Sequence, residues 1–360
     1  MAEVQPAPPT LDSFEQPIKG VSLWRDAWRR LQRNRMAIAG LTVVMLYSLL
    51  SLLAPILPIH SYKHQVLDHQ YLPPSFKMAG DVLYERQKQM RMASAGNQGR
   101  SELNEKEKED LAQWQIKNEG ATQSFEGKRV RIYQRRYLLG TDALGRDLLS
   151  RILYGGQVSI TIGLVGTLTA VLIGVIIGAL AGYLGKTFDY FAMRIVDVMY
   201  GLPYMLLVII FMAVFGRNIV NLFFCLALVS WLTVSRVVRG QIISLKNSEF
   251  VQAARVVGAG TGRIVFRHLV PNTLGVVVVF TTLQIPSFIL MESFLSYLGL
   301  GVQAPLASWG SLVRDGVDGM SNYPWMLFFP GLAMTAFLFS MNFLGDGLRD
   351  ALDPQSKNRL

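Results

Sequence analysis

The stretch EFVQAARVVGAGTGRIVFRHLVPN, residues 249–272, lies between two long apolar runs of the chain. Glu249 would occupy the first turn of a helix, near the positive end of the helix dipole, with Ser248 as its N-cap. The apolar positions recur at helical spacing and form one stripe: Phe250, Val251, Ala254 and Val257. Gly258 follows as a residue suited to the left-handed conformation that ends helices. The sequence therefore predicts a short amphipathic helix outside the membrane, whose apolar stripe needs a groove in another protein.

The order of residues in this stretch resembles the EAA loop of the permeases of binding-protein-dependent ABC importers. The matching positions are Glu249, Ala253, Ala254, Gly258, Ile264 and Pro271. Gln252 departs from the pattern, because many members of this branch carry Glu there. The resemblance implies that the short helix docks on a cytoplasmic ATPase subunit and couples transport to ATP hydrolysis. The alternative interpretation is an amphipathic loop helix that lies on lipid headgroups.

The composition predicts a membrane protein, because 51% of the 360 residues are hydrophobic and 17% are charged. In a soluble protein the net charge of +10 would suggest nucleic-acid binding. Here the basic residues cluster beside apolar runs, so they are expected to orient the chain in the membrane, and no nucleic-acid partner is expected. Cys225 is the single cysteine and lies in an apolar run, which excludes an intrachain disulfide and a cysteine-based metal site.

Six apolar runs are long enough to cross a bilayer, which takes about 20 helical residues: 36–59, 157–184, 191–215, 218–237, 272–298 and 325–345. The expected fold class is therefore an all-α polytopic membrane protein with six transmembrane helices. A cleaved signal peptide is the alternative for the first run, but that run is too long for a signal-peptide core. Gly174, Gly178 and Gly182 recur every four residues in the second run and predict a close helix contact.

An even number of spans puts both termini on the same side of the membrane. Arginines cluster before the first span and in the loop before the fifth, and the positive-inside rule assigns both to the cytoplasm. The predicted domains follow in chain order: a cytoplasmic tail with an interfacial helix (1–35), the first transmembrane helix (36–59), a large extracytoplasmic insert (60–156), a transmembrane core (157–345) with its cytoplasmic loop (239–272), and a cytoplasmic tail (346–360).

Most of the insert, residues 60–136, is polar and charged. Its segment 101–118 predicts a helix with Ser101 as a possible cap, and no strand pattern is evident. His60, His64 and His69 lie close in the sequence. Because their spacing matches no strong metal-site template, no metal site is expected.

Charged residues inside spans are rare, because each costs about 2.5–3.5 kcal/mol by insertion scales. Glu292, in the fifth run, is a candidate for the translocation pathway, or else pairs with a polar group of a neighbouring subunit. Arg194 and Asp197 are three residues apart and can form a structural ion pair. A near-match to a phosphate-binding loop at 178–187 has Leu180 in place of its first glycine and joins a membrane helix to a turn, so no nucleotide site is expected.

Three further segments resemble the oligopeptide and dipeptide branch of the same importers: GTDALGRDLLSRILYG at 140–155, ESFLSYLGLGVQAPLASWGS at 292–311, and FLGDGLRDALDP at 343–354. The resemblance implies the type I ABC importer permease fold and a C-type permease subunit of the inner membrane, which binds no cofactor and is not an enzyme. Its implied partners are a related B-type permease in a heterodimer, two cytoplasmic ATPase subunits that bind ATP and Mg, an extracytoplasmic peptide-binding protein, and membrane lipid.

Oligopeptides are the expected substrate, and the residues leave dipeptides, nickel chelates and peptide antibiotics open as alternatives. A stand-alone secondary transporter is disfavoured, because such proteins place ion-coupling residues at broken helices and only Glu292 qualifies. A membrane enzyme would need acid, base or nucleophilic residues clustered at one depth, and the sequence shows no such cluster.

Overall fold

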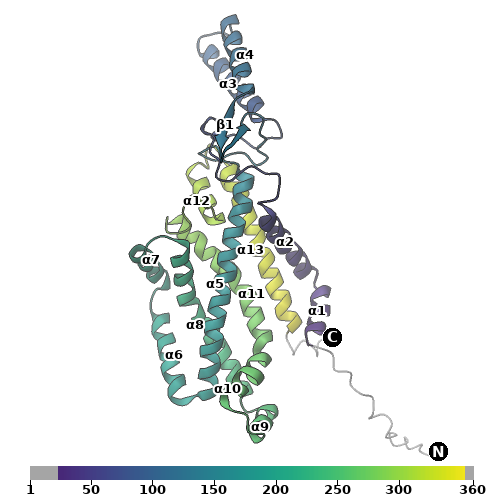
Figure 1. The fold of residues 1–360 in the computed structure, drawn as a ribbon, viewed down its shortest axis with the longest axis vertical. Helices are drawn as coiled ribbons and strands as arrows, with labels where there is room; N and C mark the ends of the chain where they lie inside the picture. Colours follow the sequence, from purple (N-terminus) through teal and green to yellow (C-terminus); the bar gives the residue numbers. More distant parts are fainter. Residues whose placement is uncertain (1–22, 353–360) are drawn as a thin grey trace, which may run out of the picture.

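The computed structural model describes residues 23–352, so the parts of the expected tails at 1–22 and 353–360 lie outside the described residues. A bundle of long helices carries a small domain at one end and the α9 loop at the other (Figure 1). Within the described part, five helical runs are long and apolar enough to cross a membrane: α2 (Arg35–Leu53), α5 (Leu148–Leu184), α8 (Ile219–Leu245), the run Thr261–Tyr297 that contains α11 (Val270–Tyr297), and α13 (Trp325–Leu352).

The expected third span, residues 191–215, is a bent pair of helices rather than one helix. α6 (Lys186–Gly201) and α7 (Tyr204–Phe215) meet at an angle of 84°. Pro203 causes the break, because its ring disfavours the helical conformation at Leu202, which is extended with ψ 139°. If the bent pair counts as one span, the described residues hold up to six spans, as the sequence predicts.

The core of the bundle is formed by α5 packed along α8, with α11 and α13 on the side of α5 away from α6 (Figure 1). The glycine stripe of α5 faces α8. A Cβ on Gly174 would lie 2.6 Å from the Cβ of Val234, and a Cβ on Gly182 would lie 2.9 Å from the carbonyl oxygen of Arg239. Only glycine allows the two backbones to approach this closely. What the stripe contributes to assembly stays a prediction.

The expected interfacial helix is α1 (Leu23–Arg33), and it lies partly on protein. Ala27 and Leu31 are buried in the same apolar cluster as Leu344 and Ala351 of α13. Trp28 is 49% exposed on the outer side. The inner face of α1 is therefore held by α13, and only its outer face is available to lipid headgroups.

The insert contains the 3₁₀ turn η2 (Leu67–His69), α3 (Ala79–Asn97), α4 (Glu105–Glu119) and an antiparallel hairpin of β1 (Thr122–Phe125) and β2 (Lys128–Arg131). Two expectations are wrong here. The hairpin was not anticipated, although Glu126 and Gly127 both have positive φ, as a primed two-residue turn requires. The cap of α4 is Asn104 rather than Ser101, because Asn104 and Glu107 form a reciprocal capping box.

Candidate functional site

The loop that contains residues 249–272 begins with α9 (Glu249–Val256) and lies at the end of the bundle opposite the insert (Figure 1). Ser248 occupies the N-cap position, but its hydroxyl donates to the carbonyl oxygen of Leu245 instead of capping α9. Gly258 ends the helix with φ +84°. The backbone N–H of Ala259 donates to the carbonyl oxygen of Ala254 at 3.0 Å, which closes the helix end in the manner of a Schellman motif.

The predicted apolar stripe of α9 is divided between two surfaces. Val251 is fully buried in an apolar cluster of this chain that includes Ile264, and Ala254 packs against the same cluster. Phe250 is 39% exposed and Val257 is 87% exposed. Only the exposed half of the stripe is therefore available to another protein. The buried half, Val251 and Ala254, anchors α9 to α8 and to the helical segment that follows.

Sequence reasoning missed Val256, which is 88% exposed beside Val257. These two adjacent valines form an apolar surface that no part of the described chain covers. Ala253 and Gln252 are also exposed, and the Gln252 amide donates to the carbonyl oxygen of Asn247 at 2.9 Å.

The chain returns to the bundle through α10 (Thr261–Arg263) and a π-helical turn, η3 (Ile264–Leu269). Ile264 and Leu269 are buried against the cluster that holds Val251, and Pro271 lies in the first turn of α11, where a missing N–H is tolerated. The loop is thus a rigid extension of α8 and α11 rather than a loose connection.

Glu292 lies in the interior of this chain, with 0% exposure. Its Oε1 accepts hydrogen bonds from the hydroxyls of Ser296 at 2.5 Å and Ser308 at 2.7 Å. Ser308 also caps α12 (Trp309–Asp318), so the carboxylate ties the start of α12 to α11. Glu292 is therefore enclosed within its own chain, while its Oε2 has no hydrogen-bond partner among the described residues, and its place in the translocation pathway stays a prediction.

The expected ion pair between Arg194 and Asp197 is not formed. Asp197 accepts from Arg236 of α8 at 2.5 Å, and Arg194 lies 5.6 Å from the ring centroid of Tyr190. The pairing crosses from α6 to α8 because the packing of these helices brings Arg236 to Asp197, which spacing along one helix cannot show.

A buried charge network supports the GTDALGRD segment at the end of the bundle near the insert. Asp142 accepts from Arg146 and Arg151, both at 2.7 Å, and Arg151 also pairs with Asp315 of α12 at 3.2 Å. Asp147 caps α5 by accepting from the backbone N–H of Ser150. These contacts join the insert, α5 and α12, while Oδ1 of Asp147 and Nε of Arg151 are buried without a hydrogen-bond partner among the described residues.

The three histidines of the insert form a structural cluster. Across residues 23–352, no group of three or more His, Cys, Asp or Glu is placed to hold a metal ion. His64 contacts Gln123 at 3.0 Å, and Nδ1 of His69 lies 2.9 Å from the hydroxyl of Tyr137. Burial, with Arg135 nearby, lowers the pKa of His69 to about 3, so this ring is neutral at physiological pH.

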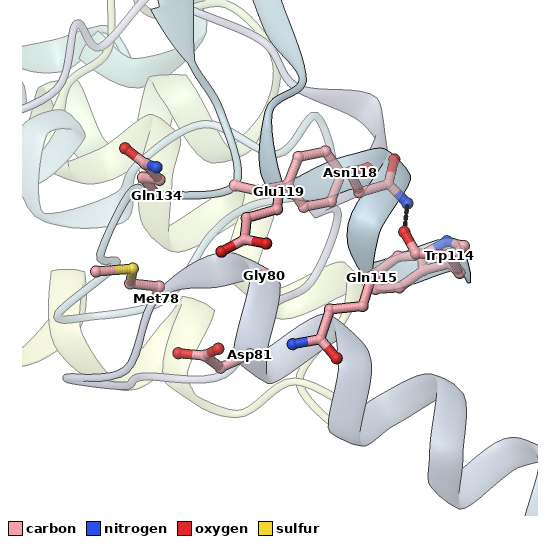
Figure 2. Close-up of a pocket in the computed structure, with 9 residues that line it drawn as sticks. Met78, Gly80, Asp81, Trp114, Gln115, Asn118, Glu119 and Gln134 are labelled. Carbon is pink, nitrogen blue, oxygen red and sulfur yellow. Dashed lines mark hydrogen bonds between the residues drawn. The ribbon is translucent and has the colours of Figure 1, made fainter. Parts of the chain in front are cut away.

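A small pocket of about 80 Å³ lies in the insert between the start of α3 and the end of α4. Figure 2 shows Asp81 and Glu119 on its wall, and the Asn118 amide donating to the carbonyl oxygen of Trp114. The volume is well below that of pockets that hold small ligands, so it is a surface crevice.

Two family models match the chain. Residues 174–358 match the binding-protein-dependent transport system inner membrane component, and residues 22–74 match the N-terminal transmembrane domain of oligopeptide transport permease C. The chain belongs to the binding-protein-dependent transport permease family. This permease is 39% identical over 350 residues to the oligopeptide transport system permease protein OppC of Escherichia coli K12, with 97% of each chain covered. It is 37% identical over 345 residues to the dipeptide transport system permease protein DppC of Bacillus subtilis, with 96% of this chain and 89% of that one covered.

Family membership makes the chain a multi-pass helical permease of the inner membrane, which confirms the fold class and the resemblance inferred from the sequence. The models cover α1, α2 and the chain from Gly174 onward, including the α9 loop and Glu292. They leave residues 75–173 unmatched, and these include α3, α4 and the hairpin. The predicted boundaries and role of the insert stay predictions.

Proposed function

We propose that this permease is the C-type transmembrane subunit of an ABC importer that moves peptides, oligopeptides foremost, into the cytoplasm. Its partners in this proposal are a B-type permease, two ATPase subunits that bind ATP and Mg, and an extracytoplasmic peptide-binding protein. The oligopeptide and dipeptide names of its relatives support a peptide substrate. Identities of 39% and 37% do not separate the two peptide classes, so dipeptides stay an alternative.

The observation that carries the coupling proposal is the division of α9. Val251 anchors the helix to the bundle, while Val256 and Val257 are almost fully exposed at its end. Burying a valine side chain stabilises a contact by about 1.5–3 kcal/mol. A rigidly anchored helix with two exposed valines suits a groove on an ATPase subunit, to which it transmits motion. The proposed topology places α9 and both termini in the cytoplasm and the insert outside.

The substitution Val256→Glu tests this proposal. It changes a side chain that is 88% exposed in this chain, so the permease should fold and insert normally. In the complex, an unpaired carboxylate in an apolar groove costs several kcal/mol. We expect the variant to lose its ATPase subunits in pull-downs, or to keep them with ATP hydrolysis no longer stimulated by the peptide-loaded binding protein.

Ser244→Glu is the matched control, because Ser244 is exposed near the same end of α8 but lies outside α9. It adds the same charge and should leave ATPase recovery and stimulated hydrolysis unchanged. Wild-type behaviour of Val256→Glu in both assays would refute the coupling role and would favour a helix that lies on lipid headgroups.

A further inference from the structure

The outer surface of α1 carries a row of basic side chains, which we call the arginine stripe: Arg25, Arg29 and Arg33. All three are exposed, and they follow one another at intervals of four residues. Successive members lie about 40° apart around the helix, and the stripe is about 12 Å long. Three guanidinium groups therefore share one face of a helix of 11 residues.

The arginine stripe has no counter-charge within residues 23–352. The acidic residue of α1, Asp26, is paired with Arg30 at 2.9 Å. Across the same range, no carboxylate lies within salt-bridge distance of Arg25, Arg29 or Arg33. Like charges four residues apart destabilise a helix, so the stripe by itself is unfavourable and an anionic partner would relieve the repulsion.

The opposite face of α1 is fixed to the bundle. Ala27 and Leu31 are buried against the end of α13, where a Cβ on Gly347 would lie 3.2 Å from Cδ1 of Leu31. Asn34 alone separates α1 from α2, the first candidate span, and its side chain accepts from the backbone N–H of Ala37 at 3.1 Å. The arginine stripe is therefore held at the level where this span begins (Figure 1).

Trp28 lies between the buried face of α1 and the arginine stripe. It is three residues from both Leu31 and Arg25, about 60° from each around the helix, and is 49% exposed. An indole ring has an apolar body and one N–H donor, so tryptophan gathers at the depth of lipid headgroups. The order Leu31, Trp28, Arg25 around the helix thus follows the change from acyl chains to headgroups at a bilayer surface.

We propose that the outer surface of α1 is a binding site for anionic phospholipids, whose phosphate groups the arginine stripe contacts. Guanidinium groups bind phosphate through paired N–H donors. Basic clusters beside a span attract anionic headgroups, and each arginine strengthens the attraction about fivefold. Zwitterionic headgroups carry a positive amine next to the same phosphate, so they satisfy the stripe less well. The site is independent of what the permease transports.

Quenching of Trp28 fluorescence by brominated lipids measures the preference of this site. The complete importer is reconstituted in phosphatidylcholine vesicles that contain an increasing fraction of brominated phosphatidylglycerol or of brominated phosphatidylcholine. Subtracting the quenching of a Trp28→Phe variant removes the contribution of the other tryptophans. We expect brominated phosphatidylglycerol to be preferred over brominated phosphatidylcholine at Trp28 by about tenfold or more, since three arginines contribute.

Variants of the arginine stripe test whether its charge causes the preference. Arg29→Gln should lower the preference about fivefold, and Gln at all three positions should abolish it. Lys at all three positions keeps the charge and should keep most of the preference. Lys246→Gln is the matched control, because it removes one positive charge at the end of α8, outside α1, and should leave the preference unchanged.

Three results would overturn the proposal. Equal quenching of the wild type by both brominated lipids would show that the surface of α1 does not distinguish anionic headgroups. The absence of Trp28 quenching by either lipid would show that another protein covers this surface. Loss of the preference in the lysine and glutamine triple variants alike would show that the arginines support the structure of α1 and do not act through their charge.

Discussion

The glycine stripe of α5 allows a quantitative test of helix packing. The substitution Gly178→Ala adds a Cβ that would lie 3.0 Å from the Cα of Ser235 and closer still to its carbonyl oxygen. Real Cβ atoms do not approach backbone atoms this closely, so α5 and α8 must separate. Gly240→Ala is the matched control, because Gly240 lies inside α8 with no other atom within 4 Å of the added Cβ.

The expected magnitude follows from comparing the two variants. Each removes a glycine from a long helix, which by itself stabilises the helix by about 0.8–1 kcal/mol. This gain is common to both and cancels in the difference. Forcing a methyl group into a packed contact costs about 1–3 kcal/mol. Gly178→Ala should therefore be about 1–3 kcal/mol less stable than Gly240→Ala.

Cys225 supplies the assay. It is the single cysteine of the chain and is 2% exposed on α8, so its thiol reacts with a fluorogenic maleimide only when the bundle opens. Labelling of this chain is followed against temperature for wild type and both variants. A lower midpoint for Gly178→Ala together with a wild-type or higher midpoint for Gly240→Ala is expected. Equal midpoints for the two variants would show that α5 and α8 are not in close contact at Gly178.

Four further predictions address other parts of the permease. Ser308→Ala removes both the cap of α12 and a donor to Glu292, and should lower stability in the same thiol assay by about 1–3 kcal/mol, with Glu292→Gln having a smaller effect. His69 is neutral when folded, with a pKa of about 3, and regains its ordinary pKa near 6.5 on unfolding. Stability is therefore full above pH 6.5 and falls by up to about 1.4 kcal/mol per unit as pH drops toward 3, a slope that unfolding curves should show to be smaller in His69→Gln. Gly258→Val should strain the end of α9 by about 1–2 kcal/mol and reduce peptide-stimulated ATP hydrolysis, whereas Gly258→Asn, which tolerates positive φ, should not. A cysteine at Asn97 should react with an impermeant maleimide in cells with a permeabilised outer membrane, and reaction only after lysis would reverse the proposed topology.

Local periodicity and composition were enough to predict five of the six helical spans, because an apolar run of about 20 residues has few other stable conformations in a bilayer. The exception is the run 191–215, which the structure divides into α6 and α7. The glycine spacing of α5 indicated a close helix contact, because residues four apart lie on one face of a helix and glycines there let a second helix approach. The helix 249–256 and its end at Gly258 also follow from residue order, because helical spacing of apolar residues and a left-handed glycine are local signals. The expected side-chain cap by Ser248 does not form, because its hydroxyl donates to Leu245. These predictions needed no knowledge of what packs against each element.

The tertiary structure decided which side chains form ion pairs and hydrogen bonds with one another. Asp197 pairs with Arg236 and not with Arg194, and Glu292 meets Ser308, because helices far apart in sequence pack side by side. The stripe of α9 divides into Val251, which is buried, and Val257, which is exposed, only once α8 and η3 take their places beside it. Sequence alone determines which faces of a helix are apolar or polar, but burial and pairing depend on the neighbours of each face, and those neighbours are set by the fold of the whole chain.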